Sequence, residues 1–231
     1  MLSRKFMYAA NAVMPPIISI SEESAVLTAA RMILNGDVIA LPTDTIYGFA
    51  VSAQNNNGIK KLYEMKRRDM NKPIAICISS IEETKLWGET SHLEDGLLDS
   101  LLPGAVTVVL KRKALLNPLL NPHTNLIGIR IPKFSFIQNL SRVCGIPLAL
   151  TSANLSTETS PLNISEFIHL WPELGGIFDA GTLGNLSVTD RAGSTVVDLS
   201  EPNYFNIIRS GSALESTLAL LKKYNLKEKT N

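Results

Sequence analysis

The chain has 231 residues, of which 45% are hydrophobic and 19% are charged, the proportions of an ordinary globular protein. A chain of this length can bury a sizeable core, as one large domain or as two small ones. The formal net charge of +1 excludes a general electrostatic attraction to nucleic acid or to anionic membranes, so any basic site must come from local clustering of lysine and arginine.

The N-terminal segment, residues 1–17, is expected to be a flexible extension. It contains Arg4 and Lys5, and no acidic residue precedes Glu22; this composition fits a weak mitochondrial presequence, and a merely disordered extension fits equally well. No apolar run approaches the roughly 18 residues of a membrane-spanning helix, and the N-terminus lacks a secretory signal. We therefore expect a cytoplasmic protein without membrane insertion, with mitochondrial import left open.

Helix and strand patterns alternate along the first half of the chain. A helix is predicted from its N-cap Ser21 to a stop signal at Asn35-Gly36. The sequence then predicts a strand over 38–41, a helix over 58–67, a strand over 74–78, a helix around 97–102 and a fully buried strand over 105–110.

The second half continues the alternation. It predicts strands over 127–131, 148–151, 177–179, 194–199 and 204–209, with helices over 134–144 and 164–170, and a final helix whose capping box is Ser212 with Glu215. Because no linker or repeat divides the chain, we predict one α/β domain over 18–226 and a frayed tail over 227–231. The two cysteines, Cys77 and Cys144, have no CxxC spacing and are predicted to be core residues.

Small polar residues follow two of the predicted strands. The stretch "LALTSANLS" (148–156) ends in hydroxyl and amide side chains, and "PTDTIYGFA" (42–50) places two threonines and an aspartate after a strand. Carboxyl ends of strands in open α/β sheets often hold ligands, and such groups can orient a small polar substrate. Local turn and cap formation is the plain alternative for each stretch.

A basic segment and two strand arginines indicate an anion site. Six basic residues lie between Lys60 and Lys72, and a helical projection turns Lys66 toward the core. Arg130 in "IGIRIP" and Arg209 in "NIIRSG" lie on apolar strands, where each needs a partner: a ligand anion or an internal carboxylate. Taken together, these residues favour a ligand that carries phosphates.

The usual phosphate and catalytic motifs are absent from the sequence. It has neither GxxxxGK[ST] nor a strand-linked GxGxxG, and its three histidines show no metal-ligand or triad spacing. Without a nucleophile or an evident base, catalysis would rest on positioning and charge neutralisation. Phosphoryl or nucleotidyl transfer suits that pattern.

Seven stretches occur together in the order and approximate spacing of the YrdC-like threonylcarbamoyl-AMP synthases, and the chain resembles the animal members most. They are "PTDTIYGFA", "K-x-R" at 66–68 followed by "NKPIAI", "LLPGAVTVVL", "IGIRIP", "LALTSANLS", "GSTVVDLS" and "IIRSG". The resemblance implies a twisted mixed, largely parallel open sheet with flanking helices around a deep concave pocket.

It also implies an activity: L-threonine, bicarbonate and ATP would give threonylcarbamoyl-AMP, pyrophosphate and water. The product would pass to the tRNA threonylcarbamoyl-transferase machinery, for tRNAs that read codons beginning with A. Mg2+ would accompany ATP, held by the phosphates and by no protein side chain, and no organic cofactor is implied.

The resemblance carries roles onto particular positions. Catalysis would fall to Lys66 and Arg68, which neutralise charge on the phosphates. Threonine would be held by Thr45, Arg130, Leu150 and Ser194. ATP would be held by Lys66, Arg68, Lys72, Leu126, Ser152, Asn154, Ser160 and Arg209.

The chain departs from the family pattern at two positions: Asp69 stands where many members have proline, and Cys77 where some have a histidine toward threonine. The main alternative function is a noncatalytic RNA-binding module, which would exploit the basic segment and leaves room for weak tRNA affinity. Near-neutral charge and the lack of an aromatic and basic stripe count against it. A third reading, an accessory carbamoyl-transfer domain of hydrogenase maturation, lacks the neighbouring segments it would need.

Overall fold

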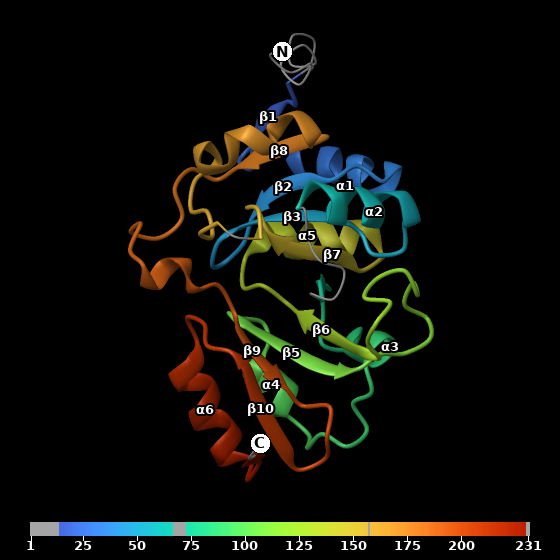
Figure 1. The fold of residues 1–231 in the computed structure, drawn as a ribbon, viewed down its shortest axis with the longest axis vertical. Helices are drawn as coiled ribbons and strands as arrows, with labels where there is room; N and C mark the ends of the chain where they lie inside the picture. The colour runs from blue at the N-terminus through green and yellow to red at the C-terminus, as the bar shows by residue number, and fades with distance from the viewer. Residues whose placement is uncertain (1–13, 67–72, 157, 230–231) are drawn as a thin grey trace, which may run out of the picture.

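A computed structural model describes residues 14–66, 73–156 and 158–229 of the chain (Figure 1). The strands are β1 (Ile17–Ser19), β2 (Ile39–Pro42), β3 (Tyr47–Ser52), β4 (Ala75–Cys77), β5 (Val106–Lys111), β6 (Leu126–Arg130), β7 (Leu148–Ser152), β8 (Gly176–Asp179), β9 (Thr195–Asp198), β10 (Tyr204–Arg209) and β11 (Lys227–Glu228). The helices are α1 (Ala25–Asn35), α2 (Asn56–Met65), α3 (Thr84–Trp87), α4 (Leu97–Leu101), α5 (Ser135–Cys144) and α6 (Leu214–Lys223), with 3-10 helices η3 (Ile164–Glu173) and η4 (Thr189–Ala192).

All the strands belong to one twisted sheet in the order β1-β8-β2-β3-β7-β4-β6-β5-β9-β10-β11. In Figure 1, β8, β2, β3 and β7 form its upper part with α1, α2 and α5, and β6, β5, β9 and β10 form its lower part with α4 and α6. The predicted mixed α/β sheet is confirmed. It is less parallel than expected, because five pairings are parallel and five are antiparallel.

Helices cover the sheet on two sides and enclose two apolar clusters. The larger cluster packs α2, α4 and η3 against the strands. The smaller one packs α1 and α5 against β2, β7 and β8, through residues such as Ile33, Leu140 and Phe178. Cys77 and Cys144 are buried free thiols in this smaller cluster, as predicted. Within the described residues, no helix is long and apolar enough to cross a membrane.

Strand β3 was not predicted, because its residues follow "PTDT" and contain a glycine. All six of its residues are buried, and it pairs antiparallel with both β2 and β7. Thr43 makes the connection tight: its Oγ1 accepts from the backbone N–H groups of Thr45 (3.1 Å) and Ile46 (3.2 Å). The polar stretch is therefore a short hairpin turn rather than a long loop.

Two predicted helix starts are wrong. Helix α1 begins at Ala25 instead of directly after Ser21, and α6 has Ala213 as its N-cap. Ser212 does not cap α6, because its hydroxyl donates to the carbonyl of Gly193 (3.1 Å). Long-range contact with the start of β9 thus overrides the local capping signal. Lys227 and Glu228, expected at the beginning of a frayed tail, pair in parallel with β10.

Candidate functional site

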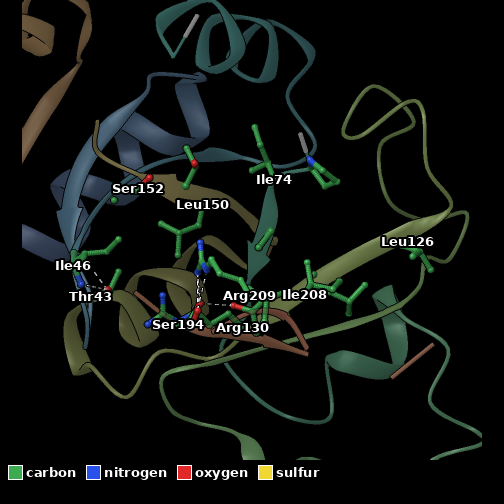
Figure 2. A pocket seen from close by; sticks show the side chains of 18 of the residues that line it. Thr43, Ile46, Ile74, Leu126, Arg130, Leu150, Ser152, Ser194, Ile208 and Arg209 are labelled. Atoms are coloured by element: carbon green, nitrogen blue, oxygen red, sulfur yellow. Dashed lines mark hydrogen bonds between the residues drawn. The ribbon is translucent and has the colours of Figure 1, made fainter. Parts of the chain in front are cut away.

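A cavity of about 470 Å³ opens over the middle of the sheet. Its walls come from segments far apart in the chain: the β2–β3 turn, β3, β4, β5, β6, β7, β9 and β10. Figure 2 shows Arg130, Ser194 and Arg209 grouped on one wall, with Ser152 and Leu150 across from them. Six of the predicted site residues line this cavity: Leu126, Arg130, Leu150, Ser152, Ser194 and Arg209.

Lys66 lies beside the cavity at the C-terminal end of α2, and only 1% of it is exposed. Its Nζ donates to the Ser152 carbonyl (2.5 Å), the Ser152 hydroxyl (3.3 Å) and Asn154 Oδ1 (3.1 Å). The inward direction predicted from the helical projection is confirmed. The ammonium group therefore connects α2 to the polar end of β7, and it holds Ser152 and Asn154 in fixed positions.

Arg130, at the end of β6, has an internal carboxylate partner. Its Nη2 donates to Asp44 Oδ1 (2.5 Å) and to Thr45 Oγ1 (2.9 Å), both from the β2–β3 turn. Asp44 also accepts from the backbone N–H of Lys133 (2.9 Å). The side chain of Arg130 is 7% exposed, and its Nε makes no hydrogen bond with any described residue. One edge of the guanidinium is thus fixed by the turn, while Arg130 still lines the cavity.

Arg209, at the end of β10, contacts the residue that precedes β9. Its Nε and Nη2 donate to the carbonyl of Ser194 (3.2 and 2.8 Å), and Nη2 also lies 3.1 Å from the Ser194 hydroxyl. That hydroxyl forms a hydrogen bond of 2.8 Å with Thr107 Oγ1 of β5. Ser194 is 3% exposed and Thr107 is 5% exposed, so this polar cluster lies at the base of the cavity.

Besides Lys66, three predicted residues that the structure describes are not among those that line the cavity: Thr45, Asn154 and Ser160. Thr45 accepts a hydrogen bond from Arg130 and Asn154 accepts one from Ser152, and both of these donors line the cavity. Ser160 lies farther off: its carbonyl accepts from Arg191 Nη1 (2.7 Å), which also pairs with Glu166. Arg68 and Lys72 fall outside the described residues, so their predicted roles stay predictions.

Cys77 is fully buried and is not among the residues that line the cavity. Desolvation raises the pKa of its thiol to about 12, and the positive charge of Arg130 opposes only part of that rise. The thiol therefore stays protonated at neutral pH, as a small apolar core group.

Asp44 and Thr107 contact predicted site residues, but the sequence assigns neither of them to the site. The pattern around Asp44 indicates only a polar turn, although an internal carboxylate is one of the two partners that the sequence allows for Arg130. Thr107 sits inside "AVTVVL", which reads as a fully buried strand, and a single threonine in such a run gives no signal of a site.

Comparisons with known proteins show which family the chain resembles. The Sua5/YciO/YrdC family model, described as "Telomere recombination", matches residues 31–211. The threonylcarbamoyl-AMP synthase of Bos taurus is 47% identical over 203 residues, covering 87% of this chain and 73% of the relative. That of Homo sapiens is 46% identical over 204 residues, with the same coverages.

Among solved structures, Pyrococcus abyssi Sua5 in complex with L-threonine superposes with a TM-score of 0.81 and 25% identity. The superposition covers 94% of this chain and 63% of the other, so the chain spans somewhat less than two thirds of that archaeal protein. The extent of the family match and the identity to the animal enzymes are decisive: the chain belongs to the Sua5/YciO/YrdC family.

Proposed function

We propose that this protein is a threonylcarbamoyl-AMP synthase, a nucleotidyltransferase. It would convert L-threonine, bicarbonate and ATP into threonylcarbamoyl-AMP, pyrophosphate and water. The observation that carries the proposal is the shared cavity, in which two cationic side chains, Arg130 and Arg209, meet neutral hydroxyl groups such as those of Ser152 and Ser194. The bovine and human synthases, which match most of the chain, support the same reading and not a noncatalytic RNA-binding module.

Each of the two arginines would bind a different substrate. Arg130 would bind the threonine carboxylate with the part of its guanidinium that Asp44 does not occupy, beside Thr45, Leu150 and Ser194. Arg209 would face the phosphates of ATP, and Ser152 and Leu126, which also line the cavity, would make further contacts with ATP. The predicted ATP contacts of Arg68, Lys72 and Ser160 complete this proposal.

The reaction needs position and charge more than a nucleophilic side chain. The amine of threonine adds to the carbon of bicarbonate, and loss of water gives a carbamate. A carbamate oxygen then attacks the α-phosphorus of ATP, the bond to the β-phosphate oxygen breaks, and pyrophosphate leaves with its electron pair. Negative charge grows on the phosphates in this step, and cations fixed in advance by the fold lower its barrier. Lys66 would contribute through Ser152 and Asn154, which it holds in place.

Mg2+ would enter with ATP. Among the described residues, no acidic side chain lines the cavity, and no three His, Cys, Asp or Glu side chains are grouped so as to hold a metal ion. The polar groups that line the cavity are neutral oxygens and cations, which suits a Mg2+ ion held by phosphate oxygens.

We further propose that the protein acts in the cytoplasm and that its product passes to the tRNA-modifying machinery. Imaging of a fusion protein with an intact N-terminus would test mitochondrial import.

Pyrophosphate release tests the proposed function. The purified chain, given ATP, Mg2+, bicarbonate and L-threonine, should release pyrophosphate and form an AMP-linked product detectable by mass spectrometry. Omission of threonine or of bicarbonate should abolish both signals. Equal pyrophosphate release without threonine would refute the assignment.

A further inference from the structure

Thr107 lies between the two cavity arginines in a row that crosses four strands. In the β5–β9 pairing it stands opposite Val196, and in the β9–β10 pairing Val196 stands opposite Arg209. On its other side, the β5–β6 register pairs Val108 with Ile129, so the next step of that ladder brings Thr107 opposite Arg130. All four residues of the row line the cavity. An anion held by either guanidinium is therefore brought close to Thr107.

The hydroxyl groups of Thr107 and Ser194 carry two protons, and the described residues provide a hydrogen-bond acceptor for one of them. The two oxygens lie 2.8 Å apart, so one of the two hydroxyl protons bridges them. Arg209 Nη2 donates to Ser194 Oγ (3.1 Å), and among the described residues neither hydroxyl makes a further hydrogen bond. One hydroxyl proton is therefore left for an acceptor in the cavity, because a buried donor without a partner is costly.

The guanidinium of Arg209 sets the direction of the hydrogen bonds from Arg209 through Ser194 to Thr107. A hydroxyl that accepts from a guanidinium becomes a stronger donor, so Ser194 gives its proton to Thr107 and Thr107 turns its own proton outward. Packing fixes the rotamer: a Cβ placed on Gly128 would lie 3.0 Å from Cγ2 of Thr107, so the methyl group sits against the bare glycine. The oxygen then faces Ser194 and the cavity.

We propose that Thr107 donates a hydrogen bond to a carboxylate-type oxygen of the amino-acid substrate, between Arg130 and Arg209. This inference rests on the proposed function, which supplies two such groups: the α-carboxylate of threonine and the carbamate formed on its amine. In either case Thr107 acts as a binding residue that helps to select an anionic oxygen at this position.

Two substitutions distinguish the contribution of the Thr107 hydroxyl from that of its methyl group. Thr107→Val keeps the shape of the side chain and the methyl against Gly128 but removes the donor, and Thr107→Ser keeps the donor and removes the methyl. Wild type and both variants are compared by calorimetric titration with L-threonine alone and by steady-state pyrophosphate release. Thermal unfolding confirms that each is folded, and Thr107→Ala replaces Thr107→Val if the latter is not.

Loss of a hydrogen bond to a charged group should weaken the affected step roughly 10- to 100-fold in Thr107→Val, with Thr107→Ser within about threefold of wild type. Weaker binding of threonine alone assigns the oxygen to the α-carboxylate; unchanged binding with a lower kcat assigns it to the carbamate. The inference is overturned if Thr107→Val matches wild type in both measurements, or if Thr107→Ser is impaired as much as Thr107→Val. Wild-type turnover separately tests the proposed function.

Discussion

At the scale of single residues, the orientation of Arg130 depends on Asp44. The two side chains are 7% and 11% exposed, and they form an ion pair of 2.5 Å that the backbone N–H of Lys133 extends. Removing one charge of a buried pair leaves the other without compensation, which costs about 3 kcal/mol or more. Asp44 thus acts as a positioning residue for the guanidinium that we assign to the threonine carboxylate.

Asp44→Asn should lower the free energy of unfolding by about 3 kcal/mol and raise KM for threonine more than it lowers kcat. Urea denaturation and pyrophosphate kinetics would measure the two effects. Lys111→Met is the matched control, because its ion pair with Glu201 is about half exposed and such pairs contribute between 0 and 1 kcal/mol. An Asp44→Asn variant as stable as this control, with unchanged KM for threonine, would contradict the positioning role.

The site could be predicted from the sequence where a residue type conflicts with its local pattern. A lysine on the inner face of α2 and arginines on apolar strands conflict with burial, so Lys66, Arg130 and Arg209 were recognised as candidates. Asp44 fits the pattern of a turn, and Thr107 fits the pattern of a β-branched strand. Neither residue type is unexpected at its position, so the sequence does not indicate a role in the site. Their part in the site comes from contacts with Arg130 and Ser194, which are remote in sequence.

At the scale of elements, the corner between β10 and α6 is packed directly on the start of β9. A Cβ on Gly211 would lie 2.2 Å from the carbonyl carbon of Ser194 and 2.3 Å from the N of Thr195. Only a glycine allows this approach of two backbones. The same approach turned Ser212 toward Gly193 and away from the capping box, which is why the local sequence misplaced the beginning of α6.

Gly211→Ala should therefore displace the segment that carries Ser194, lowering stability by about 1–3 kcal/mol and weakening threonine binding. Gly104→Ala is a suitable control, because the nearest atom to its added Cβ would be 3.6 Å away, an ordinary contact. Thermal unfolding and calorimetric titration of both variants would measure the difference. Equal melting temperatures for the two would show that the β10–α6 corner can shift without cost.

At the scale of the whole molecule, the strand order is what the sequence could not supply. Local patterns identified most strands and their burial, but β4, β7 and β6 meet at the centre of the sheet through pairings between residues more than 50 positions apart. β3, which separates β2 from β7, was missed altogether. The cavity exists only once this order is formed, since its walls come from strands across the sheet.

A ligand in this cavity should accordingly stabilise the whole domain. Binding to the folded state alone, at about 100 times Kd, adds about 2.7 kcal/mol, which for a domain of this size corresponds to a rise in Tm of roughly 5–10 °C. Threonine and ATP together should raise Tm more than either alone, because their proposed contacts come from both parts of the sheet.

Arg130→Met should remove the rise in Tm caused by threonine and keep the rise caused by ATP. Arg209→Met should remove the rise caused by ATP and keep the rise caused by threonine. Thermal unfolding of the wild type and the two variants, each alone, with L-threonine and with ATP, measures these shifts. D-threonine is the control ligand for L-threonine. Saturating ligands that leave the wild-type Tm unchanged would contradict a shared cavity as the binding site, since binding to the folded state must raise Tm.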